Sequence, residues 1–141
     1  MKAERLDHVH LYVKNLEASK ELYSRTLGTH FSDCPPDQDL GMRVSLSPLG
    51  LEIIEPTSPD SIVGRTIRSR GEGVAALSFK VPDIELAIAD LQSQGLRLVG
   101  RVNYAHLKEA QFHPRDWHGV MLELCQYEDR HPVYYAARGL V

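Results

Sequence analysis

Two histidines on one face of a short strand are the residues of this chain that most clearly suggest chemistry. Within Leu6–Val13, alternation places His8, His10 and Tyr12 on one face of a strand and apolar residues on the other. Burying two imidazoles without partners would be costly. This face is therefore expected to line a polar cavity, a ligand or a metal.

Two glutamates occupy equivalent places on strands that are otherwise apolar. Glu52 lies in Leu51–Ile53, and Glu123 lies in Leu122–Leu124. An ionised carboxylate in apolar surroundings is costly unless a positive charge meets it. Two equivalent carboxylates therefore predict a shared cation.

These residues belong to an internal repeat. Val74–Val81 repeats the pattern of the first strand, and Val81–Glu85 aligns with Val13–Glu17. We expect one α+β domain over residues 1–141, built from two modules that each run strand, helix and three strands. The expected parts are module one (5–56), a linker (57–73), module two (74–127) and a C-terminal tail (128–141).

Turn and capping residues place the elements that must position the polar side chains. Asn15 and Asp83 are expected to begin helices that end at Gly28 and Gly95, and Ser58–Asp60 resembles a helix start in the linker. The other expected strands are 29–33, 43–47, 51–54, 96–99, 109–112 and 119–125, with a loop over 100–108 and a turn over 113–118.

Composition limits the possible binding partners and the cellular location of the protein. The 141 residues are 43% hydrophobic and 25% charged with a net charge of −3, which is ordinary for a globular protein. This charge argues against nucleic acid or an anionic membrane as partner. Because no run has the length of a signal peptide core or a membrane span, we expect a cytoplasmic protein. Cys34 and Cys125 fit reduced thiols.

Four stretches of the chain carry a resemblance to a known family, namely Leu6–Leu27, Gly50–Pro56, Asp60–Gly73 and His113–Leu124. They resemble the vicinal oxygen chelate superfamily, which includes glyoxalases, bleomycin-resistance proteins and extradiol dioxygenases. The linker and the ending are most similar to methylmalonyl-CoA epimerases. The resemblance implies two βαβββ modules whose mixed sheet forms a cup with helices outside, completed within one chain or in a homodimer.

The resemblance also implies a divalent metal held by one side chain from the first and last strand of each module. By position these are His8, Glu52, Ala76 and Glu123. Ala76 stands where glyoxalases and epimerases have a histidine, and it cannot bind a metal. The remaining imidazole and two carboxylates leave open positions, as a catalytic metal requires. Oxygen-rich ligation favours Mg²⁺ or Mn²⁺, with Co, Ni, Zn and Fe as alternatives.

Such a site would support proton abstraction next to a carbonyl. A divalent cation stabilises the enolate oxygen while a carboxylate takes the proton. We expect Glu123 to be the catalytic base and Glu52 to return the proton to the other face. The expected activity is that of a metal-dependent isomerase or lyase on a small acyl compound, such as an acyl-CoA epimerase.

Two other functions stay open. A metal-free protein that sequesters a small molecule, as in the bleomycin-resistance branch, is favoured by Ala76 and by Val44, which stands where some epimerases place a glutamate base. In that case His8 and the glutamates form a hydrogen-bonded cluster. An extradiol dioxygenase needs two histidines and a carboxylate, and His10 would have to provide the second histidine.

Substrate contacts are expected from both modules. His10 and Tyr12 face the cup if the strand alternates as expected, although His10 could instead be paired with a neighbouring carboxylate. His106 and Lys108 lie in or beside a loop of the second module. The basic end of the linker could bind coenzyme A phosphates or be only a solvated helix end; its residues are Arg65, Arg68 and Arg70.

Overall fold

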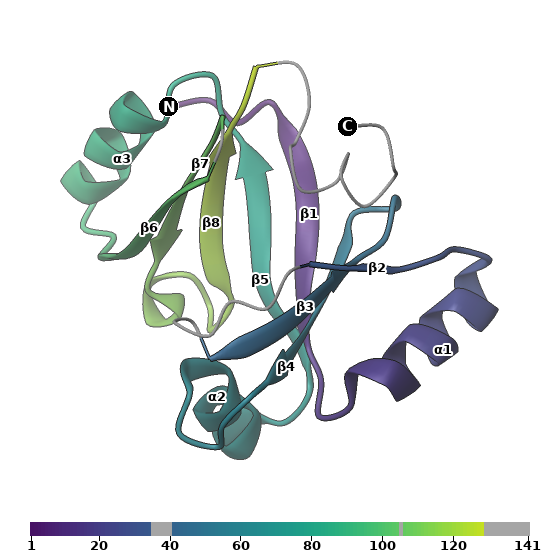
Figure 1. Cartoon of the computed structure of the whole chain (residues 1–141). Coiled ribbons are helices and arrows are strands. Elements are labelled where there is room, and N and C mark those ends of the chain that lie inside the picture. The colour runs from purple at the N-terminus through teal and green to yellow at the C-terminus, as the bar shows by residue number, and fades with distance from the viewer. Residues whose placement is uncertain (35–40, 105, 129–141) are drawn as a thin grey trace. The chain divides into compact units, whose positions relative to one another are not determined.

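The computed structural model describes residues 1–34, 41–104 and 106–128. Within these ranges the chain forms three α-helices, eight strands and one 3₁₀ turn, whose arrangement is drawn in Figure 1. Apart from Glu128, the expected tail lies outside the described residues. In chain order the elements are β1 (Arg5–Tyr12), α1 (Leu16–Leu27), β2 (Ser32–Asp33), β3 (Met42–Leu46), β4 (Leu51–Pro56), α2 (Ile62–Arg70), β5 (Gly73–Lys80), α3 (Ile84–Ser93), β6 (Leu98–Tyr104), β7 (Leu107–Phe112), η1 (Pro114–Asp116) and β8 (Met121–Gln126).

The chain forms two compact units. Unit one combines Met1–Val9 with the described residues from Ala75 onward, and unit two is His10–Val74. The first strand, β1, therefore contributes residues to both units. The expected order of strand, helix and three strands is confirmed in each half of the chain.

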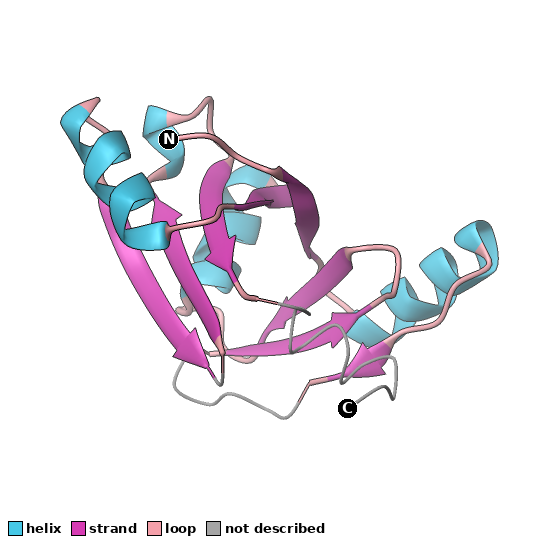
Figure 2. Cartoon of the chain, turned by 90° about the horizontal axis from the view of Figure 1, so that it is seen from above, coloured by secondary structure: helices cyan, strands magenta, loops and turns pink. Residues whose placement is uncertain are grey.

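Unit one is a mixed sheet in the order β1-β5-β8-β7-β6. Strands β5 and β8 pair in parallel, whereas β7 pairs antiparallel with both β8 and β6. Helix α3 covers one face of this sheet (Figure 2). The Asp83 side chain caps α3 by accepting from Leu86 N. The apolar core between helix and sheet includes Ile84, Ala87, Ile88, Leu91, Ala110, Phe112, Leu122 and Leu124.

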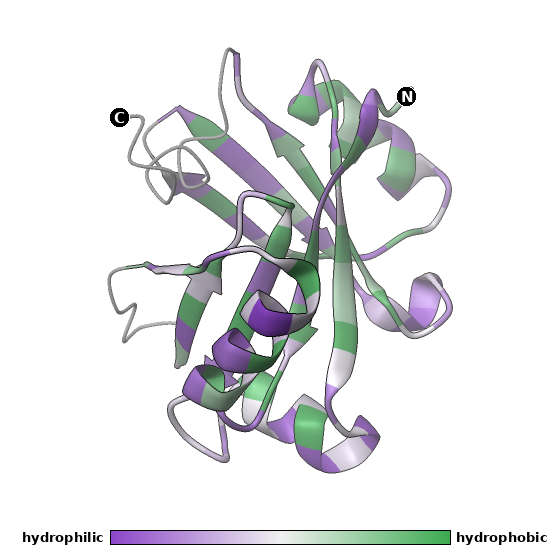
Figure 3. Cartoon of the chain, turned by 90° about the vertical axis from the view of Figure 1, so that its right-hand side faces the viewer, coloured by the Kyte–Doolittle hydropathy of each residue, from purple (hydrophilic) through white to green (hydrophobic). Residues whose placement is uncertain are grey.

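The other face of the unit-one sheet carries polar side chains. Because side chains alternate along a strand, Glu123 and Cys125 lie on the face opposite Leu122 and Leu124. Alternating hydrophilic and hydrophobic bands along the strands are visible in Figure 3. The register pairs Gln111 with Glu123. The polar face therefore extends from β8 onto β7.

Unit two has the strand order β2-β3-β4-β1. Helix α1 begins at Asn15, whose side chain accepts from Ala18 N, and ends at Gly28 with φ of 63°. Helix α2 begins at Ser61, which caps Gly64 N. None of the helices in the described ranges has the length and hydrophobicity needed to span a membrane. A small apolar core holds the unit together, formed by Val13, Leu16 and Ile53 with Tyr23 and Phe31.

Several expected boundaries are wrong. The predicted loop over 100–108 is mostly strand, because β6 continues to Tyr104 and β7 begins at Leu107. Val102 pairs with Glu109, and a register irregularity between Leu98 and Gly100 disguises the alternation. The linker helix is capped by Ser61 rather than opened by Ser58–Asp60. The predicted strand over 29–33 is reduced to Ser32–Asp33.

Candidate active site

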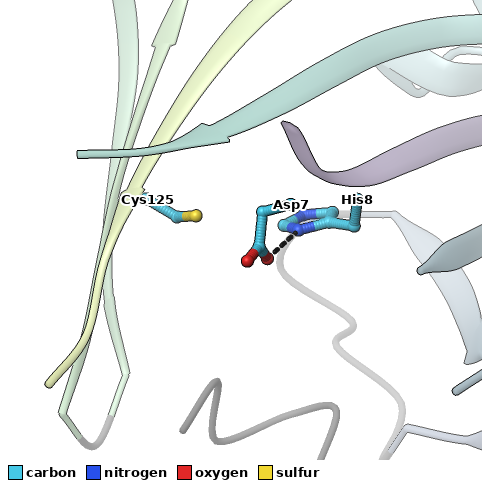
Figure 4. Close-up of side chains that lie close together, drawn as sticks. All are labelled: Asp7, His8 and Cys125. Carbon is cyan, nitrogen blue, oxygen red and sulfur yellow. Dashed lines mark hydrogen bonds and ion pairs between the residues drawn. The ribbon is translucent and has the colours of Figure 1, made fainter. Parts of the chain in front are cut away.

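A buried histidine between two carboxylates forms the centre of unit one. His8 is only 2% exposed. Its Nδ1 lies 2.9 Å from Asp7 Oδ2, and its Nε2 lies 3.1 Å from Glu123 Oε1. Figure 4 shows the Asp7 carboxylate meeting the His8 ring, with Cys125 nearby. Both ring nitrogens of His8 therefore face carboxylate oxygens.

Asp7 is held in place from its other side. The Tyr127 hydroxyl donates to Asp7 Oδ1, and Arg5 Nη2 donates to the same oxygen at 3.2 Å. Burial raises the pKa of Tyr127, and the hydrogen bond to Asp7 raises it further. An Asp7 carboxylate that accepts these bonds fixes the proton of His8 on Nδ1.

Glu123 is fixed through both of its oxygens. Its Oε1 faces His8, and its Oε2 accepts a hydrogen bond from Gln111 Nε2 at 2.8 Å. The Glu123 residue is 2% exposed. An amide that donates to one oxygen sets the carboxylate plane and leaves Oε1 directed at the imidazole.

These residues fit a divalent cation. With a proton on Nδ1, the Nε2 lone pair of His8 faces a carboxylate oxygen, and two acceptors at this separation need a proton or a cation between them. Adjacent donors around an octahedral cation with bonds of about 2.1 Å lie about 3.0 Å apart, close to the 3.1 Å between His8 and Glu123. Glu109 offers a third ligand atom, and all three atoms lie within 4.8 Å of one another.

A second possible ligand group is less suited to a metal. Asp7, His8 and Cys125 also bring one ligand atom each within 4.8 Å (Figure 4). Burial raises the pKa of the Cys125 thiol strongly. Because a thiolate is the form that binds metals, a metal bound here would first have to displace the proton of the thiol.

Three other expected site residues of the first module lie in unit two, namely His10, Tyr12 and Glu52. His10 Nε2 is 3.3 Å from Glu52 Oε2, which agrees with the interpretation of His10 as a histidine paired with a carboxylate. Tyr12 is buried. The role of Glu52 as a ligand at the His8 centre stays a prediction from the sequence, as do the substrate contacts of His10 and Tyr12.

The two expected substrate residues of the second module are exposed. His106 lies in the turn between β6 and β7, and Lys108 lies on β7. Alternation places Lys108 on the face opposite Glu109 and Gln111. The substrate contacts of His106 and Lys108 stay predictions. The sequence interpretation missed Asp7, Glu109, Gln111 and Tyr127 as parts of this centre.

Comparison with known proteins identifies the fold and its relatives. Residues 7–112 match the glyoxalase/bleomycin resistance protein/dioxygenase superfamily. The chain belongs to this superfamily. The match confirms the resemblance seen in the sequence.

The similar proteins include acyl-CoA epimerases. Human mitochondrial methylmalonyl-CoA epimerase is 33% identical over 129 residues, which cover 86% of this chain and 73% of the human protein. An ethylmalonyl-CoA/methylmalonyl-CoA epimerase of Cereibacter sphaeroides is 32% identical, with 86% and 97% covered. A variant of Streptomyces coelicolor methylmalonyl-CoA epimerase, solved with 2-nitronate-propionyl-CoA, superposes with a TM-score of 0.80 at 27% identity, with 91% and 100% covered. These relatives are enzymes.

Proposed function

We propose that this protein is a metal-dependent epimerase of a malonyl-type acyl-CoA, which inverts the carbon next to the thioester carbonyl. The observation that carries the proposal is the buried His8, set between Asp7 and a Glu123 that Gln111 orients. The proposal is supported by the epimerase names of relatives that match most of the chain.

The side chains of unit one have distinct roles in this proposal. Asp7 holds the Nδ1 proton of His8, so that Nε2 and Glu123 Oε1 are both available as ligands. When bound, a divalent cation supplies Lewis-acid stabilisation of an enolate oxygen. Glu123 would accept the proton from the carbon next to the carbonyl. Glu52 is proposed, from the sequence alone, to return a proton to the other face.

Exchange of the α-proton with solvent tests this proposal. The protein is incubated with methylmalonyl-CoA in D₂O, and deuterium at C2 is followed by NMR. We expect exchange that a chelator abolishes and Mn²⁺ restores. A Glu123→Gln variant should exchange at least about 100-fold more slowly, because it cannot act as a base.

The matched control is Glu85→Gln, in the same unit. The Glu85 side chain is 58% exposed and contacts Arg101, so this variant should exchange at the wild-type rate. Wild-type protein that binds metal but exchanges no α-proton would refute the proposal.

A metal-free binding protein is the second candidate, and Ala76 favours it. Ala76 is fully buried on β5 and offers no ligand where the resemblance implies a histidine. Metal analysis of the purified protein, with His8→Ala beside it, separates the two functions. Metal in the wild type that His8→Ala loses supports the epimerase. Absence of metal together with unchanged ligand affinity in His8→Ala supports the binding protein.

The assembly and the location are also proposed. We expect a homodimer in the cytoplasm, acting on a small-molecule acyl-CoA without nucleic acid or membrane. Light scattering of the purified protein measures its mass directly. A mass near the 15.9 kDa of one chain would contradict the dimer.

A further inference from the structure

Strand β7 brings two polar side chains to the Glu123 face of unit one. Gln111 pairs in register with Glu123, and Glu109 pairs with Cys125. Because paired residues on neighbouring strands point to the same face, Glu109 and Gln111 share the polar face with Glu123. Gln111 already donates to Glu123. Glu109 is therefore the second carboxylate of this face.

Glu109 lies within reach of the His8 centre. One carboxylate oxygen of Glu109, one of Glu123 and a ring nitrogen of His8 lie within 4.8 Å of one another. His8 and Glu123 are buried, and Glu109 is half-buried. Three carboxylates, those of Asp7, Glu109 and Glu123, surround one imidazole. Arg5 compensates the Asp7 carboxylate in part, and a cation bound between His8, Glu109 and Glu123 would stabilise the other two carboxylates.

A buried hydroxyl lies on the same face. Ser78 is fully buried, and its hydroxyl interacts with the Cys125 thiol. Ser78 pairs in register with Glu123, and neighbouring strands lie about 4.8 Å apart. Ser78 therefore adds a polar side chain to this face, and its hydroxyl is directed at Cys125.

The histidine that the resemblance implies is missing from the adjoining position. Ala76, two residues before Ser78 on β5, shares the face of Ser78 by alternation and carries only a methyl group. A metal held by His8 and Glu123 therefore lacks one side-chain ligand in unit one. Glu109 is the residue there that offers a further ligand atom together with both.

We infer that Glu109 supplies the metal ligand that Ala76 cannot supply. This inference rests on the proposed metal-dependent function and specifies the ligands of the same site. The set in unit one then consists of one imidazole nitrogen and carboxylate oxygens. Such a set favours Mg²⁺ or Mn²⁺ over ions that prefer nitrogen or sulfur ligands.

Direct Mn²⁺ binding tests the inference without using activity. Metal-free protein is titrated with Mn²⁺, and free Mn²⁺ is measured by electron paramagnetic resonance. Glu109→Gln keeps the side-chain size and should weaken binding by about tenfold or more, since it removes a charged ligand. Glu109→Asp keeps the charge and should fall between Glu109→Gln and the wild type. Mg²⁺ should displace Mn²⁺ from the wild type.

The control and the outcomes separate this inference from the proposed function. Glu85→Gln, exposed on α3, should bind Mn²⁺ as the wild type does, and circular dichroism verifies that each variant is folded. Wild-type affinity in a folded Glu109→Gln protein, together with lost affinity in His8→Ala, would overturn the role of Glu109 and leave the proposed function standing. No Mn²⁺ binding by the wild type would overturn both.

Discussion

In the proposed metal site, the hydrogen bond from His8 Nδ1 to Asp7 is the contact that leaves His8 Nε2 available as a ligand. A ligating histidine usually donates its other ring proton to a carboxylate or carbonyl, and loss of that partner typically costs 10- to 100-fold in metal affinity, as a rough range. Asp7 provides this partner at 2.9 Å. In the proposed site, metal affinity is therefore expected to depend on Asp7, which is not itself one of the proposed ligands.

An Asp7→Asn variant tests that dependence. We expect Mn²⁺ affinity to fall by about 10-fold or more, because a neutral amide holds the Nδ1 proton less firmly. Asp90→Asn, on α3 where Asp90 contacts the amino group of Met1, is the control and should bind as the wild type does. Equal affinity in Asp7→Asn and wild type would exclude the orienting role.

Tyr127 gives the same cluster a dependence on alkaline pH. Its pKa is raised above the ordinary value of 10.0 by burial and by Asp7. The native state therefore holds the phenol proton more tightly than the unfolded chain does. The contribution of Tyr127 to stability is complete below about pH 10 and is lost as the pH rises towards the raised pKa.

Urea unfolding of wild type and Tyr127→Phe from pH 8 to 11 measures this contribution. Below pH 10 the variant should be less stable by about 1 kcal/mol, because Asp7 loses a donor. The difference in free energy of unfolding should narrow above pH 10. A difference that stays constant to pH 11 would show that the phenol proton is not involved.

At the scale of elements, the sequence predicts the strands that carry His8 and Glu123. It does not predict which residues of the neighbouring strand share their polar face. His8 and Glu123 are predicted as site residues because each is an ionisable residue on a strand that is otherwise largely apolar. Glu109 and Gln111 follow the same alternation, with Ala110 and Phe112 on the core face, but the charged run before them resembled a loop. Asp7 was missed for another reason, since alternation does not predict that a side chain contacts its own neighbour's ring.

Helix α2 contains a glycine that is required by close packing. A Cβ atom on Gly64 would lie 2.5 Å from Ser58 O and 2.7 Å from Pro59 O. Alanine normally stabilises a helix interior relative to glycine by up to about 1 kcal/mol. Here the clash with the backbone that leads into the helix outweighs this gain.

We expect Gly64→Ala to lower the free energy of unfolding by about 1–3 kcal/mol, as overpacking does. Ser69→Ala, at an exposed position of the same helix, is the matched substitution and should be neutral or slightly stabilising. The urea concentration at the midpoint of unfolding, measured for the wild type and both variants, tests this prediction. A stabilised Gly64→Ala protein would contradict the close approach of Ser58 to the helix.

At the scale of the whole molecule, the two cysteines report on separate units. Cys34 lies in unit two and Cys125 in unit one. Burial raises the pKa of Cys34 to about 12, with further contributions from Glu52 and Asp33, and burial also raises the pKa of Cys125. Both thiols should react slowly in the native state at pH 8, because the thiolate is the reactive form.

Pulsed thiol labelling along a urea gradient, read by mass spectrometry, then tests whether the units unfold together. Since β1 contributes residues to both units, loss of this strand should disrupt both. The two cysteines should become reactive at the same urea concentration. Two separate midpoints would mean that each unit unfolds independently.

Because β1 contributes residues to both units, truncating the chain at the boundary between them removes part of a sheet. The amino-terminal residues pair with the second half, as the hydrogen bond from Glu4 N to Lys80 O illustrates. A fragment that starts at Ala75 would leave β5 with an uncovered edge, and uncovered edges recruit other chains. Such a truncated piece is expected to aggregate when expressed alone, and a synthetic peptide of residues 1–9 should help to keep it in solution.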